Sequence, residues 1–346
     1  MKKICILVLL IAFLGLGLVA CDNRERLYVF NWGDFMCDEL LRQFEREYGV
    51  RIIFADYGSN EEMYTRMVVG GGLFDIIIPS DYMIERLIAE GRLRQINWDN
   101  VPNIRYIFPW ILERSEAFDP GLLYSVPYKW GTFGILYNTT MVDQPVYSWS
   151  ILWDPQFADQ VFLYDIARDT FGAAQKKLGI SLNSTDHDEL MMARDALLEL
   201  RPRVRAFLQD PIKDSMIGRE GALATVFNGC AMWSISQNDE LNYVVPIEGT
   251  QLWINAMVIP ANAPNPELAE AFLNFMSRPD VALQNTLFTG FATTNHAAFD
   301  ELPEDWRNNP IYWPTQEAID ASEVFVDLGP FREYLERAWT EVRAGN

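Results

Sequence analysis

The run from Leu27 to Phe35 carries the residues best suited to binding a ligand. It begins with aromatic and β-branched residues that suit a buried strand, and Asn31 and Gly33 break it. Trp32 and Asp34 are therefore expected at the carboxyl end of the strand, where open α/β sheets hold ligands. An indole face beside a carboxylate suits an ammonium group, through cation–π attraction and charge pairing. The same residues also suit a core tryptophan next to an acid in a solvated turn.

A second turn of this kind spans Pro79 to Tyr82, between a strand-like run and a helical pattern. In a parallel sheet this turn lies beside the one that carries Trp32. Ser80 is equally well explained as the N-cap of the following helix. Tyr82 either packs the protein's lobes together or forms a platform for a ligand.

Strand-like and helix-like segments alternate through the first third of the chain. In order, the expected elements are a helix at 38–48, a strand at 50–57, a helix at 61–69, a strand at 74–78 and a helix at 83–89. This alternation predicts a parallel sheet with helices on both faces. The Gly70-Gly71-Gly72 run precedes a strand and lacks a following Lys-Ser or Lys-Thr, which excludes a phosphate loop.

The alternating pattern restarts after residues 124–138, a segment that resembles a crossing between two lobes. The later elements are expected as a strand at 161–164, helices at 170–178 and 188–200, a strand pair at 231–235 and 243–245, a strand at 251–260 and a helix at 265–275. A chain of 346 residues exceeds what one core usually supports, and no flexible linker interrupts it. We expect one lobe from 21–131 plus 254–300 and another from 132–253 plus 301–346.

The first 20 residues have the pattern of a secretory signal peptide. Lys2 and Lys3 precede an uncharged apolar stretch that is short for a membrane span, and Leu18-Val19-Ala20-Cys21 ends it. This last sequence resembles a bacterial lipobox. The resemblance implies diacylglycerol on Cys21, palmitate among its acyl chains, and a protein tethered to the periplasmic side of a bacterial membrane. Soluble export is the alternative.

Composition limits the other function classes. The formal net charge is −20, and removal of Lys2 and Lys3 with the signal makes it −22, which disfavours nucleic acid and favours cationic partners. Cys37 and Cys230 are expected as buried thiols, although an exported pair could also form a disulfide. The chain has two histidines and no Cys/His cluster, so a zinc site has little support.

Eight motifs occur along the chain in the order found in the spermidine/putrescine-binding receptors of ATP-driven importers, which the sequence resembles over nearly its whole mature length. They are Asn31-Trp32-Gly33-Asp34-Phe35, Ser59-Asn60-Glu61, Pro79-Ser80-Asp81-Tyr82, Val126-Pro127-Tyr128-Lys129-Trp130-Gly131, Ala167-Arg168-Asp169, Phe227-Asn228-Gly229, Ile259-Pro260-Ala261-Asn262-Ala263 and the run from Phe275 to Ala282.

The resemblance implies a two-lobed α/β periplasmic-binding-protein fold of type II. Each lobe would be a mostly parallel sheet flanked by helices, and a polyamine would lie in the cleft between them. It also implies a monomer without a cofactor, whose closed form a membrane permease reads. The site residues that the resemblance implies are Trp32, Asp34, Phe35, Ser80, Tyr82, Asp169, Phe227 and Trp253.

Four positions depart from the family pattern. Ile166 and Asn255 stand where the spermidine receptors carry acids, Phe291 replaces a tyrosine, and Phe325 falls near an expected glutamine. We include Asn255 and Phe291 in the expected site. Asp34 and Asp169 would then match two ammonium groups, so we expect putrescine to be preferred over spermidine. Asp81 or Asp165 could supply a missing charge, although each is better explained as a solvated turn or capping residue.

Two other function classes fit parts of the sequence. A glycoside hydrolase also uses paired carboxylates and aromatic platforms, but no nucleophile and base are arranged for catalysis, so we expect no enzyme. A receptor for another solute is the second alternative. An amino-acid receptor needs an arginine for the α-carboxylate, and Arg168 is the one arginine in the matched site motifs. We expect Arg168 to be structural and to pair with a nearby acid.

Overall fold

The computed structural model describes residues 24–33, 35–69, 71 and 73–345. The expected signal peptide, the lipidation site Cys21 and the site residue Asp34 lie outside the described residues. Within the described part of the chain, no helix combines the length and the apolar character that a bilayer span requires.

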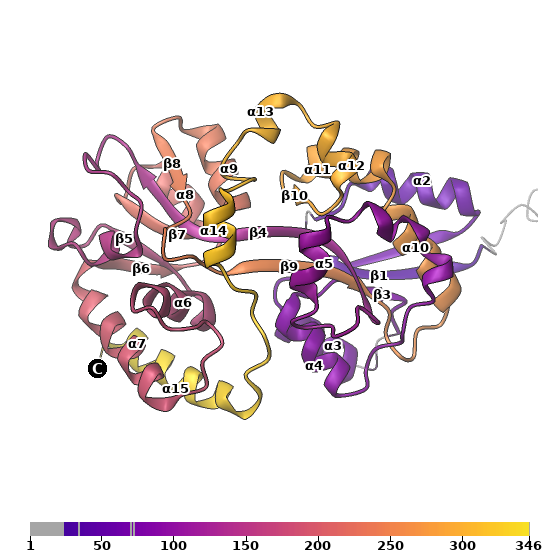
Figure 1. The fold of residues 1–346 in the computed structure, drawn as a ribbon, viewed down its shortest axis with the longest axis horizontal. Helices are drawn as coiled ribbons and strands as arrows, with labels where there is room; N and C mark the ends of the chain where they lie inside the picture. The colour runs from indigo at the N-terminus through magenta and orange to yellow at the C-terminus, as the bar shows by residue number, and fades with distance from the viewer. Residues whose placement is uncertain (1–23, 34, 70, 72, 346) are drawn as a thin grey trace, which may run out of the picture.

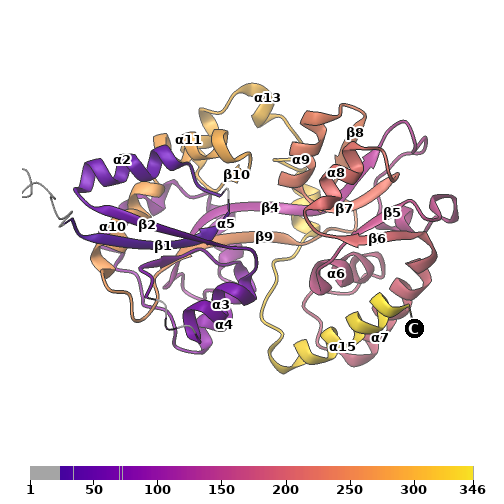
Figure 2. The same cartoon turned by 180° about the vertical axis from the view of Figure 1, so that it is seen from behind.

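Two lobes lie side by side and are joined by two central antiparallel strands, β4 (Ser125–Asn138) and β9 (Leu252–Val258) (Figures 1 and 2). The strand order through both lobes is β2-β1-β3-β9-β4-β7-β5-β6. Residues 125–132 of β4 pair with β9, whereas residues 133–138 pair with β7 and β8. β4 therefore passes from one lobe into the other between Thr132 and Phe133.

The first lobe is built on three parallel strands, β1 (Arg26–Trp32), β2 (Arg51–Tyr57) and β3 (Ile76–Ile77). The short strand β10 (Ala292–Thr293) pairs antiparallel with β4. Its helices are α2 (Asp38–Tyr48), α3 (Asn60–Val68), α4 (Asp81–Ala89), α5 (Pro109–Ser115), α10 (Pro266–Met276), α11 (Pro279–Thr289) and α12 (His296–Asp300). Gly49 ends α2 with a φ of 69°, a conformation that glycine adopts at little cost.

The second lobe repeats this plan with parallel strands β5 (Val161–Tyr164), β6 (Val204–Leu208) and β7 (Leu223–Phe227), and with β8 (Leu241–Val244) antiparallel to β4. Its helices are α6 (Ala167–Lys177), α7 (His187–Leu200), α8 (Pro211–Ile217), α9 (Asn228–Gln237) and the final α15 (Arg332–Ala344). The chain reaches α15 through α13 (Glu304–Arg307) and α14 (Gln316–Ala321).

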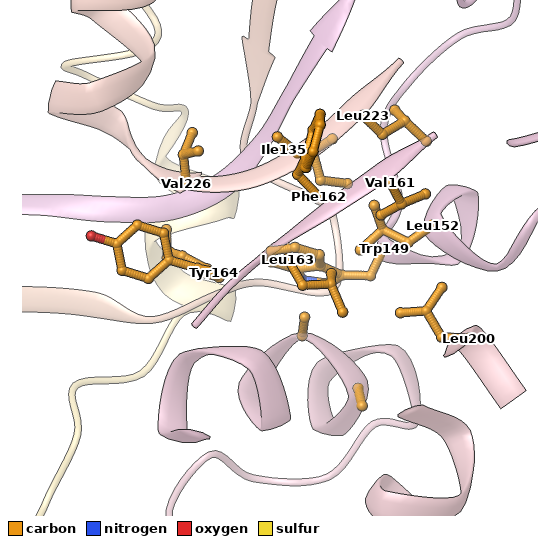
Figure 3. Close-up of a cluster of buried hydrophobic side chains, with 14 of the residues drawn as sticks. Ile135, Trp149, Leu152, Val161, Phe162, Leu163, Tyr164, Leu200, Leu223 and Val226 are labelled. Carbon is orange, nitrogen blue, oxygen red and sulfur yellow. The ribbon is translucent and has the colours of Figure 1, made fainter. Parts of the chain in front are cut away.

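Each lobe has its own apolar core. In the first lobe, one cluster covers each face of the sheet, and the side chains of β9 alternate between the two clusters. In the second lobe, β5 side chains from Val161 to Tyr164 meet Trp149, Leu152 and Leu200 in one cluster (Figure 3). These rigid sheets hold the strand ends and helix starts that face the boundary between the lobes.

The structure corrects part of the sequence prediction. Residues 231–235, predicted as a strand, lie inside α9, where Ala231 and Ser234 are buried at helical spacing. Strands β6 and β7 were not predicted, and β7 immediately precedes this helix. Asn31 does not break β1, because it pairs with Asp56 of β2 and the strand ends at Trp32.

Candidate functional site

The carboxyl ends of β1 and β3 bring the first group of predicted site residues together. Trp32 ends β1, and its indole Nε1 donates a hydrogen bond to the Ile78 carbonyl oxygen at 2.9 Å. The Tyr57 hydroxyl donates to the same oxygen at 2.7 Å, and its ring lies 4.8 Å from the Trp32 ring. Trp32 is thus fixed against the end of β3 and remains partly exposed.

The start of α4 places Ser80 and Tyr82 beside this strand end. The Tyr82 hydroxyl accepts a hydrogen bond from Asn60 Nδ2 at 2.9 Å and donates one to Glu61 Oε1 at 3.1 Å. Ser80 occupies the N-cap position of α4, but its side chain makes no capping hydrogen bond, and its backbone forms a bridge with Asn255. The first turn of α4 therefore connects the Asn60-Glu61 pair to β9.

Asp81 is fully buried, so its interpretation as a solvated turn residue is wrong. Its carboxylate accepts backbone N–H bonds from Tyr82 at 2.8 Å and from Ile254 of β9 at 3.3 Å, so Asp81 links the start of α4 to β9, whereas the N-cap residue of α4 is Ser80. Burial raises the pKa of Asp81 to about 7. Asp165, the other alternative acid, forms an ion pair with Arg343 at 3.4 Å.

Asp169 comes from the other lobe, in the first turn of α6. Its side chain is 5% exposed, and its Oδ1 has no hydrogen-bond partner in the structure. Burial raises the pKa of Asp169 to about 7, while neighbouring Arg168 opposes this rise and Glu61 adds to it. A buried carboxylate oxygen without a partner is costly unless a donor approaches it.

Arg168 is a structural residue, as the sequence predicted, but it does not pair directly with an acid. Its guanidinium donates to the Val326 carbonyl and to Asn183 Oδ1, both at 2.8 Å. No carboxylate of the described residues lies within 4.0 Å of it. The guanidinium instead covers the buried Phe325 ring at 4.2 Å and approaches Tyr82 of the other lobe at 6.0 Å. Burial lowers the pKa of Arg168 to about 10.

A row of aromatic rings crosses from the second lobe to the first. The ring-centroid distances are 5.2 Å for Tyr164–Phe227, 6.3 Å for Phe227–Trp253, 5.9 Å for Trp253–Phe291 and 4.5 Å for Phe291–Phe35. Asp169 lies near the Tyr164 end of this row, because α6 follows β5 directly and the hydroxyl of the next residue, Thr170, donates a hydrogen bond to the Tyr164 carbonyl oxygen. The predicted residues Phe35, Phe227, Trp253 and Phe291 therefore form one continuous apolar wall.

Two glycines allow this wall to form. A Cβ on Gly131 would lie 2.2 Å from Asn228 Oδ1 and 2.5 Å from the Trp253 ring. A Cβ on Gly229 would lie 2.2 Å from the Phe291 ring. These distances are shorter than van der Waals contact, so no side chain fits at either position without displacing the wall.

Several buried polar side-chain atoms of β1, of residues 251–255 and of the start of α9 lack hydrogen-bond partners in the structure. They are the side-chain oxygens of Asn31, Asn228, Gln251 and Asn255, the Nδ2 of Asn31 and the Nε1 of Trp253. Most are acceptors, so the group as a whole suits a ligand rich in N–H donors. Asn31 and Asn228 belong to motifs that the sequence analysis identified, but neither was predicted as a site residue.

In the ranges described, no group of three or more His, Cys, Asp or Glu side chains could hold a metal ion. Cys37 is buried and Cys230 is half-buried, and both are free thiols.

Comparison with known proteins identifies the family. The family model for a bacterial extracellular solute-binding protein matches residues 39–314. The chain belongs to this family. Its members are solute-binding proteins rather than enzymes, and the family assignment implies an extracytoplasmic location.

Relatives of this solute-binding protein match it over nearly its whole length. The spermidine/putrescine-binding periplasmic protein of Escherichia coli is 34% identical over 334 residues, which cover 96% of this chain and 95% of the relative. The structure resembles that of the spermidine/putrescine ABC transporter substrate-binding protein PotD from Streptococcus pneumoniae, with a TM-score of 0.86, 36% identity and coverage of 93% and 99%. It also resembles the TpPotD lipoprotein of Treponema pallidum, with a TM-score of 0.84, 25% identity and coverage of 92% and 100%. These neighbours establish the two-lobed type II fold.

Proposed function

We propose that this protein is a lipid-anchored polyamine receptor that captures putrescine or spermidine between its lobes and delivers it to the permease of an ABC importer. Putrescine is the preferred ligand. The observation that carries this proposal is the buried Asp169 carboxylate, whose Oδ1 has no partner and which lies in the first turn of α6, beside the Tyr164 end of the aromatic row. The names of the relatives at 34% and 36% identity support the same ligand class.

Asp169 is a site for one ligand ammonium group. An ammonium that reaches Oδ1 supplies the missing donor and an opposite charge in one contact. The neighbouring Glu61 adds negative charge, and Tyr82 holds Glu61 in place through its hydroxyl. In this proposal Asp34, next to the Trp32 indole in the sequence, receives the second ammonium group.

The aromatic wall accommodates the hydrocarbon between the two charges. Each methylene group removed from water contributes roughly 0.8 kcal/mol, so the four methylenes of putrescine contribute about 3 kcal/mol. Trp253 and Phe227 present ring surface for this chain, and the unpartnered Asn255 oxygen accepts a further N–H. Ser80, Phe35 and Phe291 complete the proposed site.

The count of carboxylates favours a diamine. Each buried ammonium without a partner costs several kcal/mol, and the site offers two acids from the predicted set. Asp81 and Asp165 are committed to backbone N–H groups and to Arg343, respectively. Asp165 keeps one oxygen without a partner, but the Arg343 guanidinium already balances its charge, and Glu61 already accepts the Tyr82 hydroxyl. In this proposal none of the three acids compensates a third ammonium.

Ligand binding closes the lobes in this proposal. Asp169 belongs to the second lobe, whereas Trp32 and Tyr82 belong to the first, so only a closed form makes both sets of contacts. The change of β4 partners between Thr132 and Phe133, one residue from the proposed lobe boundary at 131/132, supports this division into lobes. The permease then recognises the closed monomer, which stays near the membrane through diacylglycerol on Cys21. The proposed role includes no catalysis.

Isothermal titration calorimetry tests the proposal. The chain from Asp22 onward is refolded to remove carried-over ligand and is titrated with putrescine and with spermidine. We expect micromolar or tighter binding, tighter for putrescine, and a loss of at least tenfold in Asp169→Asn. Asp188→Asn is the matched control, because it removes the same charge from the first turn of another second-lobe helix, α7, where Asp188 is exposed, and it should leave the affinity unchanged. No binding of either polyamine would refute the proposal.

A further inference from the structure

Lys129 is the most unusual charged residue near the site. It lies on β4 and is 1% exposed, which is rare for a lysine without an acidic partner. Its Nζ donates a hydrogen bond to Thr289 Oγ1 of α11, and among the described residues no carboxylate lies within 4.0 Å of it. Beside it is a cavity of about 10 Å³, with room for roughly one water molecule.

The amine of Lys129 lies against the aromatic wall. Its Nζ is 5.4 Å from the centroid of Phe35 and 5.5 Å from the centroids of Tyr128 and Phe291. Phe35 and Phe291 are the last two rings of the row that begins near Asp169. The wall therefore has a carboxylate near one end and an amine at the other.

The sheet register directs Lys129 toward the same face as the proposed ligand contacts. Lys129 pairs with Asn255 across β4 and β9, and Gly131 pairs with Trp253 two residues further on. Residues opposite each other in antiparallel strands share a face. Lys129, Asn255 and Trp253 therefore lie on one face of the sheet.

We propose that Lys129 is a specificity-determining residue that excludes a third ligand ammonium group from the Phe35 end of the aromatic wall. This inference rests on the proposed polyamine function and gives a second reason for the preference for putrescine. A third ammonium group lacks a carboxylate partner, and the lysine ammonium also repels it. The rings and the Thr289 hydroxyl stabilise the lysine ammonium where it is. A triamine would have to place its additional cation near the same rings.

The size of the effect follows from the distances. A cation on the opposite face of Phe35, within the usual 6 Å or so of the ring centre, would lie about 10 Å from Nζ. At an effective dielectric constant near 20, repulsion over about 10 Å weakens binding roughly tenfold. Burial lowers the pKa of Lys129 well below its ordinary value, so the repulsion acts at pH values at which the amine is protonated.

The test compares spermidine and putrescine affinities by calorimetry in wild type and in Lys129→Met at pH 7. We expect the ratio of the spermidine Kd to the putrescine Kd to fall about tenfold in the variant. Lys129→Gln, which keeps a donor for Thr289, should show the same fall and serves if Lys129→Met does not fold. Lys129→Arg keeps the charge and should retain the wild-type ratio.

Lys177→Met is the matched control, because Lys177 also lies over an aromatic ring, Trp153 at 4.9 Å, but within the second lobe. Its ratio should equal that of wild type. A ratio that stays within twofold of wild type in folded Lys129→Met or Lys129→Gln overturns the inference, as does an equal fall in Lys129→Arg. If wild type binds neither polyamine, the proposed function itself fails, which is a different outcome.

Discussion

Polyamine binding should release a proton from Asp169 near neutral pH. Burial raises the pKa of this carboxyl to about 7 in the ligand-free structure. A ligand ammonium at Oδ1 stabilises the ionised form and so lowers the pKa of Asp169 in the complex. Because the complex then holds fewer protons than the free protein, affinity should rise with pH up to about 7 and level off above it.

The magnitude follows from the ionised fraction. With a pKa of about 7, roughly one tenth of Asp169 is ionised at pH 6 and about nine tenths at pH 8. The putrescine Kd should therefore be about tenfold weaker at pH 6 than at pH 8. Titration at pH 7 in two buffers of different ionisation enthalpy should report release of about half a proton per ligand bound.

Asp169→Asn isolates the contribution of this residue, since the pKa of Asp81 is also raised to about 7. The variant should bind putrescine weakly and with little dependence on pH between 6 and 8. An affinity that is constant over this range in wild type, or a heat of binding that does not depend on the buffer, would refute the assignment of Asp169 as an ammonium site.

Four further perturbations have expected outcomes. Asp169→Asn should stabilise the ligand-free protein at pH 8 by up to roughly 4 kcal/mol. The pKa of Asp169 is raised from 3.8 to about 7 in the folded state, so the wild-type protein loses stability as the pH rises from 4 to 7. Urea unfolding should show the stability gain of the variant shrinking toward pH 4, and a gain that does not change with pH would contradict this reasoning. Trp253→Leu should weaken putrescine about tenfold through loss of ring surface, with the half-exposed Trp233→Leu as the control, and equal affinities would argue against the wall. Gly131→Ala should cost about 1–3 kcal/mol in urea unfolding because its Cβ would clash with Asn228, whereas Gly58→Ala, whose nearest contact is 3.7 Å, should be close to neutral, and the reverse order would refute the packing argument. Arg168→Met should lower the free energy of unfolding by about 2 kcal/mol, because it removes the hydrogen bonds to the Val326 carbonyl and to Asn183 Oδ1. An unchanged free energy of unfolding would show that these hydrogen bonds do not stabilise the fold.

The sequence predicted the first lobe well because its helices and strands have clear periodicity and stop signals. The helix at 38–48 matches α2, which Gly49 ends, and the strand at 50–57 matches β2 within one residue. The wrong strand prediction at 231–235 arose because a short apolar run is compatible with both the helical and the strand periodicity. Tertiary packing favours the helix, which buries Ala231 and Ser234 on one face.

The site was predicted in part. Aromatic and acidic residues at strand ends carry a local signal, so the loops of Trp32 and Tyr82 could be identified. Asn31, Asn228 and Lys129 carry no such signal, because their importance arises from burial. Asn31 and Asn228 are buried with unpartnered oxygens, and Lys129 is buried with a hydroxyl partner, Thr289, but no acid. Such burial depends on the packing of segments far apart in sequence. The same holds for Arg168, whose partners at 183 and 326 are distant along the chain.

A crystal structure of the putrescine complex would test the central claim most directly. We expect one ammonium nitrogen of putrescine within about 3 Å of Asp169 Oδ1 and the methylene chain against the rings of Trp253 and Phe227. A ligand bound elsewhere, or one whose ammonium groups leave Asp169 Oδ1 without a partner, would contradict it.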